Sequence, residues 1–128
     1  MGVFVNYIPL PFAGLNNIPT TILTANTNQL VVNGIMVCNY LKQDMRFNLK
    51  KHRAQATPVE IFYIVNFEVK AGQSVDILEE TNIKEILLEY DNTVTPAISD
   101  SLICYSNGYT QVFDCEVTYT QLNELPMS

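Results

Sequence analysis

The chain has no tryptophan, a single histidine and five glycines that lie far apart among its 128 residues. Metal sites and nucleophilic triads need converging His, Cys, Asp or Glu side chains, and phosphate-binding loops need clustered glycines. The histidine, His52, lies between Lys51 and Arg53, whose charges disfavour a bound cation. We therefore predict no catalytic residue, no metal site and no cofactor, and a protein that is not an enzyme.

Basic residues are few and are concentrated in one region. Residues 1–53 hold five basic residues and one acidic residue, whereas residues 54–128 hold two basic and twelve acidic residues, and the formal net charge is −6. Arg46, Lys50 and Arg53 form a candidate basic row on a half-exposed strand. Such polarity could steer basic faces of copies onto acidic faces, and the acidic balance disfavours a nucleic-acid partner.

Long apolar runs are missing too. No run approaches the roughly 18 residues of a membrane span, and the first residues lack the charged opening and apolar core of a signal peptide. We therefore expect no membrane partner and synthesis in the cytoplasm. Without a secretory signal, the three cysteines, Cys38, Cys104 and Cys115, are predicted to be free buried thiols.

Helical periodicity is the last absence, because no 11-residue window carries a convincing 3.6-residue apolar repeat. β-Branched and aromatic residues are plentiful, which favours strands. We predict strands over 20–25, 30–40, 45–50, 74–78 and 84–90. Asn33-Gly34 is interpreted as a bulge inside one strand, and Val59–Val69 as a strand covered on both faces.

The stretch from Ser101 to Tyr119 predicts a hairpin around Asn107-Gly108, a dipeptide suited to a two-residue turn. On its second arm, apolar residues from Phe113 to Tyr119 alternate with polar ones, which indicates a half-buried antiparallel strand. With no helix to cover a sheet, we predict an all-β, antiparallel, two-sheet β-sandwich, jelly-roll-like, over residues 20–128. The predicted core contains Phe47, Ile64, Val75, Leu102, Phe113 and Val117.

Residues 1–19 carry no charge and three prolines, and they are predicted to form an extended N-terminal arm. The arm either packs on its own domain as an edge segment or reaches onto a neighbouring subunit. Deleting residues 2–18 is predicted to leave the domain folded and to abolish assembly. The candidate interaction residues of the arm are Val3, Phe4, Val5, Tyr7, Ile8, Leu10, Phe12 and Leu15.

Several segments in order resemble a family of small β-sandwich proteins found in the virions of tailed bacteriophages. The matching segments are residues 20–25, 31–39, 46–49, 67–75, 100–106 and 113–117. They include the bent strand ending in Val37-Cys38-Asn39, the Ala71-Gly72-Gln73-Ser74 turn and the Asp100-Ser101-Leu102 strand.

The resemblance implies a non-enzymatic virion component, often oligomeric, that contacts major capsid or tail proteins. We expect a capsid decoration or cement protein that uses its arm and sandwich faces. The alternative is a tail or fibre component, with a module that binds a host surface or carbohydrate through exposed loop aromatics. Tyr109 and the loop at residues 91–96 are the candidates for that contact.

Overall fold

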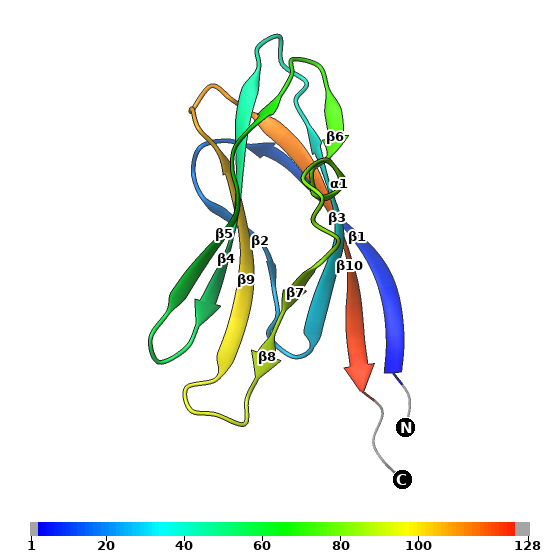
Figure 1. The fold of residues 1–128 in the computed structure, drawn as a ribbon, viewed down its shortest axis with the longest axis vertical. Helices are drawn as coiled ribbons and strands as arrows, with labels where there is room; N and C mark the ends of the chain where they lie inside the picture. The colour runs from blue at the N-terminus through cyan, green and yellow to red at the C-terminus, as the bar shows by residue number, and fades with distance from the viewer. Residues whose placement is uncertain (1–2, 125–128) are drawn as a thin grey trace.

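The computed structural model describes the backbone of residues 3–124 and the side chains of residues 9–122. Two antiparallel sheets pack face to face with the apolar core between them (Figure 1). The predicted all-β, two-sheet sandwich is therefore confirmed.

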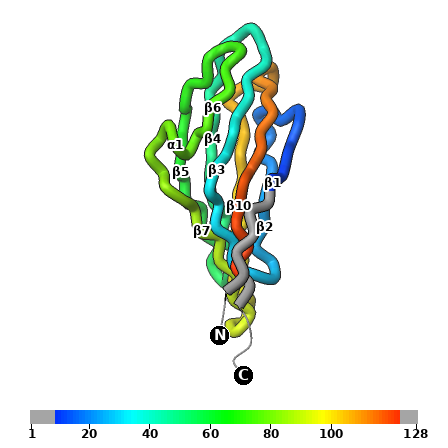
Figure 2. The backbone as a smooth tube through the Cα atoms, turned by 90° about the vertical axis from the view of Figure 1, so that its right-hand side faces the viewer, coloured from blue at the N-terminus to red at the C-terminus, as the bar shows by residue number. Residues whose placement is uncertain are grey.

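Each sheet has five strands. Sheet A runs in the order β1-β10-β3-β6, with a short β7 also paired to β3 (Figure 2). Its strands are β1 (Val3–Leu15), β10 (Phe113–Glu124), β3 (Gln29–Cys38), β6 (Ser74–Asp76) and β7 (Ile86–Leu88). Sheet B runs in the order β2-β9-β4-β5, with a short β8 paired to β9. Its strands are β2 (Thr20–Thr24), β9 (Ile98–Ser106), β4 (Met45–Ala54), β5 (Val59–Val69) and β8 (Tyr90–Asp91).

The strand order is that of a jelly roll. The first strand pairs with the last, and the pairing continues inward along the chain as β1 with β10, β2 with β9, β3 with β6 and β4 with β5. The chain is thus doubled back on itself and wrapped into two sheets, which is the double Greek-key arrangement of jelly rolls. The jelly-roll expectation is confirmed.

A short helix, α1 (Ile77–Glu80), follows β6 within a stretch predicted to be a strand. The carboxylate of Asp76 accepts hydrogen bonds from the amides of Leu78 (3.2 Å) and Glu79 (3.4 Å) and so caps the first turn. Ile77 and Leu78 are buried. The prediction of a strand over 74–78 was therefore wrong in its second half, because an N-cap and two core contacts favour a helical turn.

The interpretation of Asn33-Gly34 as a bulge is confirmed. In the pairing of β3 with β10, Gly34 is opposite Thr118 and Val32 is opposite Tyr119, so Asn33 is the extra residue. The Asn33 Oδ1 atom accepts a hydrogen bond from the Thr120 hydroxyl at 2.7 Å. The bulge therefore keeps β3 a single bent strand of ten residues.

The predicted hairpin around Asn107-Gly108 was wrong, because β9 belongs to sheet B and β10 to sheet A. Neither Asn107 nor Gly108 has a positive φ. The Ser106 amide donates to the Asn16 carbonyl (2.9 Å) and the Asn107 amide to the Arg46 carbonyl (3.2 Å). The segment crosses between sheets because β9 and β10 each pair with strands from the first half of the chain. The alternation of apolar and polar residues on β10 is correct from Phe113 to Val117.

The interpretation of β5 as a strand covered on both faces was also wrong. β5 ends the order of sheet B and has one strand neighbour, β4. Ile64 and Val69 are buried, whereas Val59, Ile61 and Val65 are exposed. The continuous apolar run is typical of a buried strand, but in this molecule it forms an edge.

The six predicted core residues are all buried between the sheets. The rings of Phe47, from sheet B, and Phe113, from sheet A, meet edge to face with centroids 5.6 Å apart. The three cysteines are free thiols, as predicted; Cys104 and Cys115 are buried and Cys38 is half-buried. A hydrogen bond with Cys115, together with burial, raises the pKa of the Cys104 thiol, so this cysteine behaves as a core residue.

Candidate interaction surface

Of the predicted arm residues, the three whose side chains the structure describes face the protein's own core. Along β1, Leu10 is opposite Val117, Phe12 is opposite Cys115 and Leu15 is opposite Phe113. All three are half-buried and pack against the core. The side chains of Val3, Phe4, Val5, Tyr7 and Ile8 lie outside the described residues. In this single chain the segment predicted as an arm is an edge strand of the sandwich, which is the first of the two alternatives.

The predicted basic row is split between two faces of β4. Arg46 is exposed and makes an ion pair with Glu68 at 3.3 Å. Lys50 lies on the same outer face, 3.7 Å from Glu60, with its ammonium 5.6 Å from the centre of the Phe62 ring. Arg53 is an odd number of residues away and points to the opposite face, as strand alternation requires.

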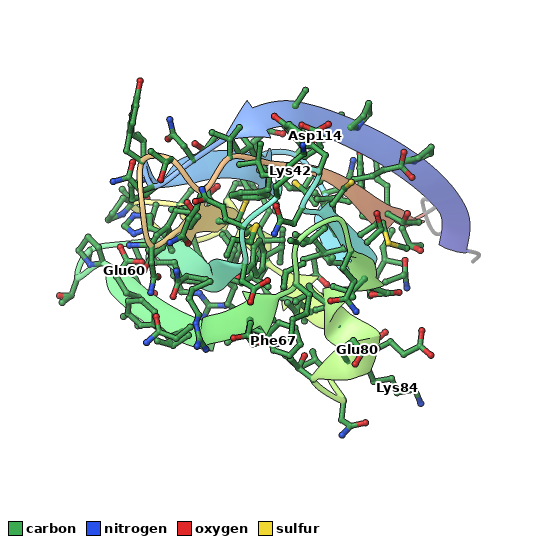
Figure 3. All side chains as sticks on the ribbon, turned by 90° about the horizontal axis from the view of Figure 1, so that it is seen from above. Lys42, Glu60, Phe67, Glu80, Lys84 and Asp114 are labelled. Carbon is green, nitrogen blue, oxygen red and sulfur yellow. The ribbon has the colours of Figure 1, made fainter. Side chains whose placement is uncertain are left out.

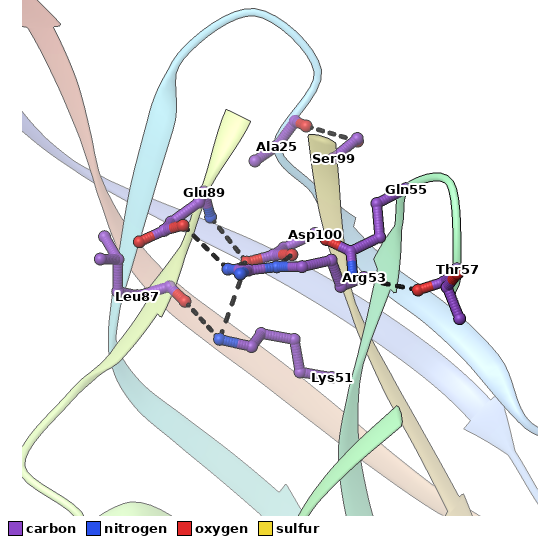
Figure 4. Close-up of polar contacts among 9 residues, drawn as sticks. All are labelled: Ala25, Lys51, Arg53, Gln55, Thr57, Leu87, Glu89, Ser99 and Asp100. Carbon is purple, nitrogen blue, oxygen red and sulfur yellow. Dashed lines mark hydrogen bonds and ion pairs between the residues drawn. The ribbon is translucent and has the colours of Figure 1, made fainter. Parts of the chain in front are cut away.

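Arg53 instead belongs to a partly buried ion cluster with Asp100, Lys51 and Glu89, in which only Asp100 and Lys51 are buried (Figure 4). Its Nε atom donates to Asp100 Oδ1 at 2.8 Å, and its Nη2 atom donates to Asp100 Oδ2 at 3.0 Å and to Glu89 Oε2 at 2.9 Å. The Glu89 amide also donates to Asp100 Oδ2, at 2.9 Å. This cluster ties β4 to β9 and to the segment before β8, so its role is structural.

The pKa of Asp100 reflects this setting. Burial alone would raise the pKa, but the hydrogen bonds from Arg53 and the Glu89 amide and the charge of Lys51 outweigh burial and lower it. The hydrogen bond to Asp100 raises the pKa of Arg53 in turn, against the effect of burial. The carboxylate therefore stays ionised although its side chain is fully buried.

Replacing Arg53 by Met is expected to destabilise the protein by about 3 kcal/mol in urea unfolding. Removing one partner of a buried ion pair costs about 3–5 kcal/mol, because a buried charge is left unpaired. We expect the lower end because the Arg53 side chain is 25% exposed and Lys51 stays 3.7 Å from Asp100. Arg46→Met is the matched control, since that exposed pair should contribute under about 1 kcal/mol. Equal effects of the two substitutions would contradict this account.

The same cluster predicts an acid-sensitive component of stability. Because the folded-state pKa of Asp100 is lowered, its contribution is fully present above the ordinary pKa of about 3.9 and is lost as the pH falls through the folded value. Urea unfolding between about pH 5 and pH 2 should show this loss in the wild type. The loss should be smaller in Asp100→Asn, which has no carboxyl group to titrate.

On the outer face of sheet B, β5 exposes two large apolar side chains, here called the β5 patch: Phe62 and Val65. Val59 and Ile61 are opposite Arg53 and Lys51 and so lie on the other face. Phe62 is 53% exposed and Val65 61% exposed. Phe62 is opposite Lys50 in the β4 pairing, on the outer face of sheet B. β5 contains neither a proline nor a lysine, the residues that often protect edge strands.

A second feature is a groove of about 420 Å³ on the outer face of sheet A, here called the sheet A groove. Its apolar lining includes Pro11, Ala13, Met36 and Cys38, and the acidic side chains of Asp114 and Glu116 border it. Pro11, Glu116, Met36 and Asp76 are successive neighbours across β1, β10, β3 and β6. The hollow forms because proline and alanine leave the β1 side of the groove short of side-chain volume.

His52 is paired with a carboxylate, because its Nδ1 atom lies 2.8 Å from Glu60 Oε1. Both side chains are at least one-third exposed on the outer face of sheet B, and the pair does not line the sheet A groove. Within the described residues, no group of three or more His, Cys, Asp or Glu side chains is placed to hold a metal ion. The site that the structure offers is a pair of surfaces suited to binding.

Comparison with known proteins gives a fold likeness and no family. No family model and no curated protein matches this sequence. A chain in the crystal structure of the T13 viral particle of infectious bursal disease virus matches 94% of this chain, with 13% identity and a TM-score of 0.55. This chain spans about a third of that one, 31% of its length. The likeness shows a shared fold.

Two further chains come from the Gx and Gt strains of the same virus. They match at TM-scores of 0.41 and 0.39, with 11% and 10% identity, and this chain covers 39% and 32% of their lengths. Scores this low add nothing to the fold assignment. Among the described residues, no helix has the length and hydrophobicity needed to cross a bilayer.

Sequence reasoning missed both the β5 patch and the sheet A groove. The run from Val59 to Val69 was interpreted as buried because apolar composition does not distinguish a central strand from an exposed edge. A usable signal was the charge on both strands. Glu60 and Glu68 interrupt the apolar run of β5, and they are opposite His52 and Arg46 of β4 in the register. Charges on adjacent strands indicate a wet face, which a strand covered on both sides lacks. Tyr109, the aromatic expected to be exposed, is 72% exposed.

Proposed function

We propose that this chain is a structural protein of a virus particle that assembles with other copies and with other virion proteins. Jelly rolls occur in viral capsid proteins, and also in lectins and cupins, so the fold supports the proposal without deciding it. The likeness to a chain of the infectious bursal disease virus particle supports it further. The observation that carries the proposal is the β5 patch, because large exposed apolar side chains are a liability in a protein that acts alone.

The finer proposal is a capsid decoration protein of a tailed bacteriophage, acting without catalysis. It is supported by the sequence resemblance to phage virion proteins and by the exposure of the patch and the groove, which offer two contacts per copy. A binding role suits the described surface, where the His52–Glu60 pair is solvent-exposed and no metal-ligand group is present.

The experiment is co-sedimentation of the full chain with particles from an infection that produces it. We expect the chain in the particle fraction of a density gradient, on heads that lack tails as well as on complete particles. Phe62→Ser should lower its occupancy at least tenfold, while Tyr109→Ser, the exposed-aromatic control, should not. A chain that stays at the top of the gradient while particles form would contradict the proposal. Presence on complete particles only would favour a tail location.

The carbohydrate-binding alternative rests on Tyr109 and on the exposed Val94 in the loop at residues 91–96. Binding of the full chain to a glycan array, lost in Tyr109→Ser and kept in Phe62→Ser, would favour that alternative over a decoration role.

A further inference from the structure

We propose that the partner of the β5 patch is the sheet A groove of a second copy of this chain, so that copies dock head to tail. The two surfaces lie on opposite outer faces of the sandwich: Phe62 and Lys50 are outside sheet B, and Met36 and Glu116 are outside sheet A. In Figure 3, Glu60 lies on the side of β5 and Asp114 on the side of β1. The inference rests on the proposed function in that it names the partner of the same surface, but its test requires only that copies of the chain associate.

Charge complementarity favours this pairing. The strands of sheet A contain no lysine or arginine, and they carry Asp76, Asp114, Glu116 and Glu124. β4 supplies Arg46 and Lys50 beside the β5 patch, where Glu68 and Glu60 pair with them, so this face is close to neutral and the outer face of sheet A is acidic. Glu116 is exposed and has no hydrogen bond or ion pair within the described residues. A basic group next to Phe62 would therefore find an unpaired carboxylate at the border of the groove.

Shape gives the second argument. The patch presents one large ring, Phe62, with Lys50 over its face at 5.6 Å. The groove is hollow and apolar, with Met36 45% exposed in its lining. A methionine side chain adapts to an aromatic ring and makes favourable contacts with it. Aromatic anchors in well-packed pockets are the usual energetic centres of interfaces.

Pairing of β5 with β5 of another copy is the competing arrangement, and the strand is poorly built for it. The register of β4 with β5 shifts on either side of Leu49, and Asn66 has a φ of 58°. Such bulges twist an edge away from regular pairing. A ladder centred on Ile64 would also bring Glu60 opposite Glu68. Face-to-groove docking avoids both problems.

The test is sedimentation velocity of the full chain and of two variants, Phe62→Ser and Met36→Lys. Both residues are exposed, so circular dichroism should stay native. We expect the wild type to associate as its concentration rises and each variant to remain monomeric. Because the contact joins different surfaces, each variant keeps one intact surface, and a mixture of the two should form a dimer that grows no further. Tyr109→Ser should associate like the wild type.

Three results would overturn the proposal. The first is a wild type that stays monomeric up to roughly 1 mM, the weak end of specific affinities. The second is a Met36→Lys variant that associates as the wild type does, which would point to a β5–β5 contact. The third is a mixture of the two variants that stays monomeric although the wild type associates. None of these results depends on whether the chain enters a particle, so this proposal and the proposed function can fail separately.

Discussion

Deleting residues 3–15 is expected to abolish cooperative folding of this protein. The strand is paired with β10 from Val3 to Leu15, and Leu10, Phe12 and Leu15 are each opposite a buried β10 residue. Full burial of one such side chain stabilises a protein by about 1.5–3 kcal/mol. The deletion removes three half-buried side chains and exposes the β10 residues that they cover. The summed loss approaches the total free energy of unfolding, which is about 5–15 kcal/mol for a typical domain. Circular dichroism and a urea titration at 25 °C would measure the loss.

This expectation reverses the prediction made from the sequence, in which a chain lacking residues 2–18 folds and only assembly is lost. The matched controls keep the chain length constant. Leu10→Ser/Phe12→Ser should destabilise strongly, whereas Pro9→Ala/Pro11→Ala, at exposed positions of the same strand, should change the free energy of unfolding by under about 1 kcal/mol. A deletion variant with a native spectrum and a cooperative transition would show that β1 is dispensable, and the neighbour-binding arm would regain support.

Replacing Phe113 by Ala is expected to destabilise the protein by about 3–5 kcal/mol, the range for a fully buried phenylalanine. Phe113 has no exposed surface, and its ring meets Phe47 of the opposite sheet edge to face at 5.6 Å. The substitution therefore leaves a cavity and removes a contact that joins the two sheets. The midpoint of urea unfolding should fall without a change in slope, since the amount of surface exposed on unfolding stays similar.

Phe62→Ala is the matched control, because Phe62 is 53% exposed on the outer face of sheet B. Its cost should be under about 1 kcal/mol. If both substitutions have the same small effect, the contact between Phe47 and Phe113 does not hold the sheets together as the structure suggests.

The candidate binding surface was only partly predictable. The basic residues of β4 stood out in the sequence, but Arg46 and Lys50 face solvent whereas Arg53 reaches the fully buried Asp100. Counting from Arg46 to Arg53 along a strand already places them on opposite faces. The edge position of β5 was not predictable, because the identity of the last strand in a sheet depends on which segments pair. The groove beside Met36 likewise joins residues from β1, β3 and β10, three strands distant along the chain.

Local pattern by itself determined most of the strands after β1, the bulge at Asn33 and the six core residues. These features depend on short-range chemistry: a side-chain period of two, β-branched residues and an Asn-Gly step. Tertiary structure alone decided that β9 and β10 separate into two sheets, that β1 pairs with β10 and that β5 is an edge. The physical reason is that strand pairing joins residues about a hundred positions apart, such as Phe12 and Cys115, and many pairings satisfy the same local pattern. The jelly-roll order is the one that buries the inner faces of the eight strands on the two main sheet paths together.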